Sequence, residues 1–194
     1  MRMMLEEEIA RAILVGDGRL SSDDDKIQQQ HIRSIANEDE LFAIHKDLVV
    51  SEGQDKAKEF VKTCIRARKD YRGSGEPTMF LSEDMLVEML LLEDKNGRVI
   101  YESEQALARA LRVKNIVTVP VMEGAKNIAG DKNILAIIVN LKDYNVGADK
   151  GGAVAMFEDF DIDYNAQKYL IETRCSGALV KPFSAIVIEE EAGE

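Results

Sequence analysis

The sequence predicts an α+β fold in two parts: a middle region of mixed helices and strands, flanked by a first helix and a terminal antiparallel sheet. Three patterns predict it. Residues 57–65 carry apolar side chains at helical spacing, and residues 134–140 form the continuous apolar run of a central strand. Residues 159–164 alternate strictly between acidic and apolar or aromatic side chains, which is typical of a half-buried strand. We expect the terminal sheet to pack on the first helix.

The first helix is predicted by an apolar face made of Leu5, Ile9, Ala12 and Ile13. Glu7 and Arg11 are four residues apart, a spacing that favours an ion pair on a helix. Gly16 is placed to take the left-handed conformation that ends many helices. No capping residue precedes this helix, so we expect the chain to be a piece of a longer protein.

Residues 19–40 are polar and have no sustained period, so they predict a long surface loop, followed by a short strand at 41–45. The next helix has Ser51 and Gln54 at the spacing of a capping box. Its apolar stripe consists of Ala57, Phe60, Val61, Cys64 and Ile65.

Residues 78–81 predict a buried strand, and Ser82 and Ser103 are placed to cap two further helices. The helix after Ser82 is apolar on most sides, so we expect it to be deeply packed; its apolar residues are Met85, Leu86, Val87, Met89, Leu90, Leu91 and Leu92. The apolar runs at 116–122 and 134–140 predict central strands.

The C-terminal region predicts three strands. After an expected loop at 143–152, a strand begins at Asp159, and residues 165–167 turn the chain into a second strand at 169–174. A third strand is expected at 179–188.

Composition excludes several classes of protein. The chain has 194 residues with 36 acidic and 25 basic side chains, a net charge of -11 that disfavours non-specific binding of nucleic acid. No apolar run is long enough to span a membrane, and the acidic start does not fit a signal peptide. Cys64 and Cys175 cannot form a disulfide scaffold, and we expect two buried, unreactive thiols.

The best candidate for chemistry is the acidic face formed by Asp159, Asp161 and Asp163, which could bind a cation. The pattern lacks the glycine and glutamate of a calcium loop, so a solvated face paired with Arg174 is the simpler interpretation. Residues 124–132 lack the spacing of a phosphate loop, and neither His31 nor His45 lies in a recognisable catalytic setting. We expect no catalytic residue, metal or cofactor.

One positive cluster stands out in this acidic chain: Lys56, Lys58, Lys62, Arg66, Arg68, Lys69 and Arg72. It lacks the interleaved aromatic side chains of a single-strand nucleic-acid site. Two interpretations stay open, a solvated helix face and a contact with an acidic neighbouring subunit.

Several stretches resemble tailed-phage major capsid proteins. The most specific is FEDFDIDYNAQKYLIETRCSGAL at 157–179, followed by PFSA at 182–185. Residues 4–19, MLEEEIARAILVGDGR, are similar to the family's long spine helix and its exit, and 103–107 and 116–120 are also family-like. The resemblance implies the Hong Kong 97-type fold, with a peripheral domain at 1–34 and 153–194 and an axial domain at 35–152. The family's N-terminal arm and extended loop have no counterpart in this sequence.

The resemblance also implies a function: a subunit that self-assembles into an icosahedral phage or prophage head around double-stranded DNA. Its partners would be other copies, a portal, and a scaffold or protease, with packaged DNA touched only non-specifically and no membrane. Its location would be the virion, and the host cytoplasm before assembly. The alternatives are an encapsulin-like nanocompartment shell and a small metal-dependent enzyme using Asp159, Asp161 and Asp163. The candidate subunit contacts are Lys62, Arg66 and Arg68 in the basic cluster and Asp143, Tyr144, Asn145, Asp149 and Lys150 in the expected loop.

Overall fold

The computed structural model describes residues 2–20, 28–50, 53–149 and 152–191. Its helices are α1 (Arg2–Val15), α2 (Lys56–Ala67), α3 (Glu83–Leu90) and α4 (Glu104–Leu111), with 3-10 turns at Ile35–Asn37, Pro120–Met122 and Leu141–Asp143. Its strands are β1 (Ala43–Asp47), β2 (Thr78–Leu81), β3 (Ile116–Thr118), β4 (Lys132–Val139), β5 (Tyr144–Ala148), β6 (Ala155–Asp161), β7 (Ala166–Glu172), β8 (Cys175–Leu179) and β9 (Ala185–Glu191). None of the helices described is long and apolar enough to cross a membrane. The mixture of helices and strands confirms the predicted class.

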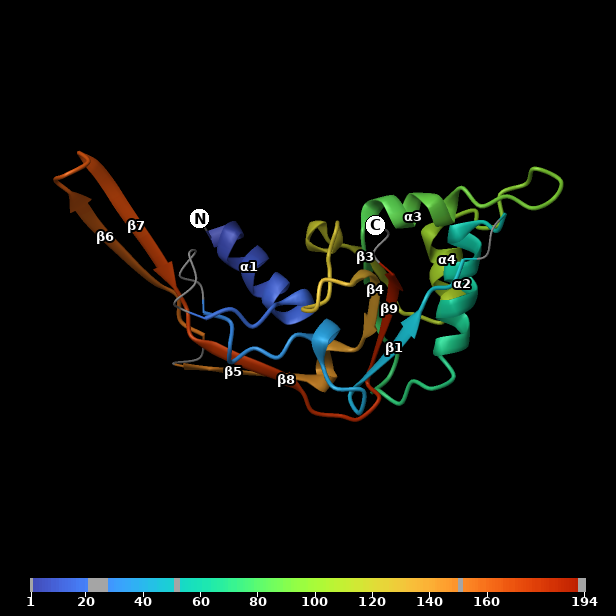
Figure 1. The fold of residues 1–194 in the computed structure, drawn as a ribbon, viewed down its shortest axis with the longest axis horizontal. Coiled ribbons are helices and arrows are strands. Elements are labelled where there is room, and N and C mark those ends of the chain that lie inside the picture. Colours follow the sequence, from blue (N-terminus) through green and yellow to red (C-terminus); the bar gives the residue numbers. More distant parts are fainter. Residues whose placement is uncertain (1, 21–27, 51–52, 150–151, 192–194) are drawn as a thin grey trace.

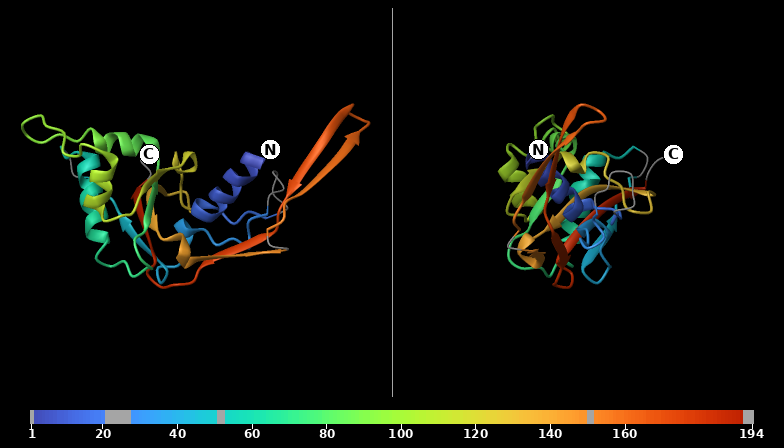
Figure 2. Two further views of the ribbon diagram at one scale, coloured as in Figure 1. Left: turned by 180° about the vertical axis from the view of Figure 1, so that it is seen from behind. Right: turned by 90° about the vertical axis from the view of Figure 1, so that its left-hand side faces the viewer.

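The molecule is elongated, with different elements at its two ends (Figure 1). Helices α2, α3 and α4 lie with a five-stranded sheet at one end. The β5–β8 ribbon extends from that sheet toward the other end, where the β6–β7 hairpin projects away from the body (Figure 2). Helix α1 lies between the two ends.

The five-stranded sheet has the order β1-β9-β4-β2-β3. Strand β4 runs antiparallel to both of its neighbours, whereas β1 is parallel to β9 and β2 is parallel to β3. The last strand of the chain therefore lies inside this sheet. Its residues Ile186, Val187 and Ile188 are fully buried, as expected for a strand covered on both faces.

Alternate residues of the strands belong to two separate cores. On one face, Ile186 and Ile188 of β9 pack with α2, α3 and α4, whose fully buried residues include Phe60, Met89 and Leu107. On the other face lies a second core, formed by Leu14, Ile35, Ala36, Ala43, Phe80, Met122, Ala125, Ile134, Ile137, Val139, Tyr144, Leu179, Ala185 and Val187. Helix α1 contributes to this second core through its C-terminal end.

The helix caps follow local chemistry. The side chains of Ser82 and Ser103 accept hydrogen bonds from the backbone N–H groups three residues later, so both predicted caps are confirmed. The predicted cap of α2 is wrong: Asp55 accepts from the N–H groups of Ala57 and Lys58, and α2 begins at Lys56. Ser51 lies outside the described residues.

The end of α1 also differs from its prediction. Gly16 does not take the left-handed conformation, which occurs instead at Gly18 with φ 70°. The carbonyl of Gly16 accepts a 2.7 Å hydrogen bond from the buried hydroxyl of Ser34. The ion pair of Arg11 is with Glu8, at 3.9 Å, rather than with Glu7.

Three predicted segments are wrong, two because tertiary contacts outweigh the local pattern and one because a proline ends the strand. The expected surface loop at 19–40 contains buried residues among those described, including Ile35 and Ala36 of the second core. The expected loop at 143–152 contains β5, which pairs with β8. The expected strand at 116–122 stops at Thr118 and lies at a sheet edge, and a 3-10 turn begins at Pro120, which has no N–H to donate.

The C-terminal prediction needs a fourth correction. Residues 179–188 do not form one strand, because a turn at 182–183 separates β8 from β9 and Phe183 there has φ 53°. The first two predicted strands pair with each other as β6 and β7. The third is divided between β8, which pairs with β5, and β9, which lies inside the five-stranded sheet, so the three do not form one terminal sheet.

Candidate assembly surfaces

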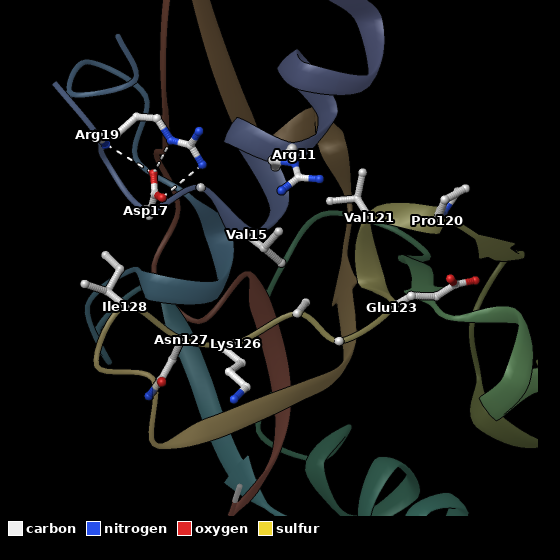
Figure 3. A pocket seen from close by; sticks show the side chains of 13 residues that line it. Arg11, Val15, Asp17, Arg19, Pro120, Val121, Glu123, Lys126, Asn127 and Ile128 are labelled. Atoms are coloured by element: carbon white, nitrogen blue, oxygen red, sulfur yellow. Dashed lines mark hydrogen bonds and ion pairs between the residues drawn. The ribbon is translucent and has the colours of Figure 1, made fainter. Parts of the chain in front are cut away.

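The described residues form a charged surface pocket of about 370 Å³ between the end of α1 and residues 120–128 (Figure 3). Arg19 donates to Asp17 across 3.0 Å, and this hydrogen bond holds the pKa of that carboxyl below its usual value. Among the lining residues are Arg11, Glu123 and Lys126, but no histidine, cysteine, serine or threonine. The pocket therefore offers charged side chains but no hydroxyl, thiol or imidazole nucleophile.

The acidic face at 159–163 does not bring its three carboxylates together as a metal site would. Asp161 forms an ion pair with Lys168 across the hairpin, and this contact lowers the pKa of Asp161. Asp159 lies directly opposite Lys168 in the register of the two strands. The expected partner Arg174 is therefore wrong, and Lys168 takes its place. Within the described part of the chain, no group of three or more His, Cys, Asp or Glu side chains could hold a metal ion.

The β6–β7 hairpin is the most exposed apolar element of the molecule. The expectation of a half-buried strand is wrong, because the hairpin is open on both faces. Its exposed apolar and aromatic residues are Met156, Phe157, Phe160, Ile162, Tyr164, Tyr169 and Leu170. Ile162 and Tyr164, in the turn at its tip, are 83% and 82% exposed. A two-stranded hairpin is marginally stable by itself in water, so these side chains favour a partner that covers them.

The register of the hairpin separates its two faces. Met156 lies opposite Ile171, and Phe160 and Tyr169 share their face, which is mainly apolar. The other face begins with the apolar pair Phe157 and Leu170. It continues toward the tip with the charged residues Asp159, Asp161 and Lys168. Each face thus offers a different surface to a partner.

The expected contact loop at 143–150 is divided between interior and surface. Asp143 is buried and accepts a 2.5 Å hydrogen bond from the N–H of Ser74. Tyr144 is buried as well, donates its hydroxyl to the carbonyl of Arg33 across 2.9 Å, and has a pKa raised by burial. Asn145 and Asp149 are exposed on or beside β5, and Lys150 lies outside the described residues.

The basic cluster around α2 is also divided. Arg68 stacks over the ring of Tyr71 at 4.4 Å and donates to the carbonyl of Arg112, and burial lowers its pKa. Lys56 forms a 2.5 Å ion pair with Glu190. Five residues remain exposed along one side of α2 and its end, at positions that follow the helical repeat. We call them the basic stripe: Lys58, Lys62, Ile65, Arg66 and Lys69.

Two residues depart from their expected burial. Ile65, assigned by the sequence to the apolar stripe of the helix, is 43% exposed in the middle of the basic stripe. Cys175 is partly exposed, whereas Cys64 is fully buried as expected, and burial raises the pKa of both thiols.

Solved structures similar to this chain include proteins of a capsid, a virus-like particle and a phage. The capsid protein of an empty GTA particle matches 98% of this chain at 11% identity with a TM-score of 0.56. A structure from Gordonia phage Cozz matches 100% of this chain at 15% identity with a TM-score of 0.55. A virus-like particle protein from Pyrococcus furiosus matches 95% of this chain at 13% identity with a TM-score of 0.53. The matched regions span 62% to 65% of those proteins. Neither a family model nor a curated protein sequence matches this chain.

Proposed function

Because the chain has the fold of phage major capsid proteins, we propose that it is a structural subunit of an icosahedral bacteriophage or prophage head that encloses double-stranded DNA. The observation that carries this proposal is the match of 95% to 100% of the chain to subunits of capsids and virus-like particles. The Hong Kong 97 type of this fold, implied by the sequence resemblance, is part of the proposal.

The exposed hairpin supports a function in self-association. A shell subunit needs surfaces that are buried only when neighbouring copies are present, and the apolar residues of β6–β7 form such a surface. Among the candidate contacts, Lys62, Arg66, Asn145 and Asp149 are exposed, so we retain them as proposed subunit contacts. Asp143, Tyr144 and Arg68 make contacts within the chain, and we leave them out.

The net charge of -11 supports a wall that touches packaged DNA only weakly and without sequence preference. The further partners in this proposal are a portal and a scaffold or protease, and the location is the virion after a period in the host cytoplasm.

We also propose the division into peripheral and axial domains, with one boundary moved. Residues 1–34 and 153–184 would form the peripheral part and residues 35–152 the axial part, with β5 of the axial range extending into the peripheral part through its pairing with β8. Strand β9 pairs with β1 and β4, so we assign residues from 185 onward to the axial part.

Electron microscopy tests the proposed function. The chain would be purified, separated by size and imaged in negative stain over a range of concentrations. We expect small oligomers or rings of discrete size. A folded chain that stays a single monomer at every concentration would contradict the proposal, and so would a turnover activity assigned to it.

A nanocompartment shell of the encapsulin kind is the second candidate, and the likeness to an archaeal virus-like particle favours it. The ratio of ultraviolet absorbance at 260 and 280 nm in particles isolated from the native source separates the two. A phage head carries DNA, whereas a nanocompartment carries protein cargo.

A further inference from the structure

We propose that the basic stripe on α2 of one copy docks against the acidic tip of the β6–β7 hairpin of a second copy. The proposal rests on the proposed function, since it names one contact by which shell subunits would join. It commits to a second copy of this chain as the partner on both surfaces.

The two surfaces carry opposite charge. Residues 155–172, which form the hairpin, contain five acidic side chains and one basic one. Residues 55–72, which form α2 and its end, contain seven basic side chains and three acidic ones. The two segments thus have equal and opposite net charges in a chain that is acidic overall. Such complementarity fixes the register of an interface and speeds encounter.

Both surfaces also keep charges that no described residue neutralises. On the hairpin, Asp161 is paired with Lys168, while Glu158, Asp159 and Asp163 form no ion pair with a described residue. On the stripe, Lys62 is paired with Glu59 across 2.5 Å. The remaining cations of the stripe, Lys58, Arg66 and Lys69, have no acidic partner in the described part of the chain.

Apolar side chains accompany the charges on both sides. Ile65 is exposed between the cations of the stripe, and Ile162 and Tyr164 are exposed in the turn at the tip of the hairpin, next to Asp161 and Asp163. An interface that combines apolar contact with a charged rim has this composition. The stripe offers an aliphatic side chain and no aromatic one, which fits a protein partner better than the stacked bases of a nucleic acid.

The shape of the molecule prevents the two surfaces from pairing within one chain, so a contact between them joins two copies. The hairpin and α2 lie at opposite ends of the elongated chain (Figures 1 and 2), so they cannot meet within one molecule. A two-fold arrangement would satisfy both contacts in a closed dimer. Any other arrangement leaves one free surface of each kind on every pair and propagates into rings or lattices.

Charge reversal tests the contact. One variant carries Lys58→Glu and Arg66→Glu, a second carries Asp159→Lys and Asp163→Lys, and a third carries all four changes. Sedimentation equilibrium at low salt measures the association of each. We expect each two-residue variant to associate at least about tenfold more weakly than the unaltered chain, because like charges then face each other. The four-residue variant should regain association, and high salt should weaken it in every associating chain.

A matched control reverses two exposed cations outside the stripe, Lys95→Glu with Arg98→Glu, and should associate like the unaltered chain. Circular dichroism confirms that each variant is folded. Association that is insensitive to all reversals would overturn this contact while leaving the proposed function intact. A chain that never associates would overturn both. Binding of duplex DNA that disappears with Lys58→Glu and Arg66→Glu, without self-association, would assign the stripe to nucleic acid and overturn the contact.

Discussion

At the scale of single residues, His45 connects four parts of the fold. Its Nδ1 lies 2.7 Å from a carboxylate oxygen of Glu189 in β9, and its Nε2 lies 3.1 Å from the carbonyl of Glu38 before β1. Both neighbours are acceptors, so only the doubly protonated ring can donate to each of them. Glu189 is buried and also forms an ion pair with Lys132 of β4. Lys132 forms a second ion pair with Asp47 of β1. The hydrogen bond to Glu189 is the main cause that raises the pKa of His45.

This geometry predicts a pH-dependent stability. A histidine whose folded-state pKa is raised contributes stability that is complete below its unfolded pKa of 6.5 and is lost as pH rises through the higher folded value. Urea denaturation between about pH 5.5 and pH 8.5 measures the unfolding free energy. We expect it to fall as the pH rises in the unaltered chain, and we expect His45→Gln to remove this part of the decrease. The control is His31→Gln, because His31 is exposed. An identical pH profile in the unaltered chain and His45→Gln would contradict this role.

At the scale of elements, the sequence predicts what local chemistry determines. The bounds of β2, the caps at Ser82 and Ser103, and the apolar run of β4 match the structure, because each depends on neighbouring residues. The strand β5 could not be predicted this way, since it exists through pairing with β8 some thirty residues later. Strand β9 begins with a continuous apolar run like that of β4. The predicted strand at 179–188 joins β9 to β8, because the sequence pattern does not reveal the turn at 182–183.

The site was predicted less fully than the fold. The alternation at 159–164 indicates a strand only in part, because β6 runs from Ala155 to Asp161 and residues 162–165 form the turn. Alternation also cannot say whether the chain itself covers the apolar face. The basic cluster is visible in the sequence, because it depends on residue types alone. Only the structure shows that Arg68 packs against Tyr71 while the basic stripe is exposed.

Helix α3 provides a direct test of such packing. It was expected to be buried on most sides, yet Val87 is 43% exposed and Leu91 is 68% exposed, whereas Met89 is fully buried. We expect Met89→Ala to lower the unfolding free energy by about 2–5 kcal/mol, because it leaves a cavity in the first core. Val87→Ala on the same helix should change it by less than about 0.5 kcal/mol. If Met89→Ala and Val87→Ala lowered the unfolding free energy equally in thermal or urea denaturation, α3 would be covered on both sides, which would contradict this packing.

At the scale of the whole molecule, we expect stability and association to depend on different regions. The two cores lie around the five-stranded sheet and contain no residue of the β6–β7 hairpin. The hairpin instead exposes apolar side chains on both of its faces at one end of the molecule. We therefore expect the body to fold without the hairpin, and we propose that a neighbouring copy covers it.

The most direct measurement is sedimentation velocity of the unaltered chain beside a chain in which residues 155–172 are replaced by a short Gly-Ser linker, from micromolar to near-millimolar concentration. We expect the unaltered chain to form oligomers that grow with concentration. The shortened chain should sediment as a monomer and keep the same urea unfolding transition, since both cores are intact. Two monomeric chains, or oligomers that survive loss of the hairpin unchanged, would contradict the account of a shell subunit that associates through this element.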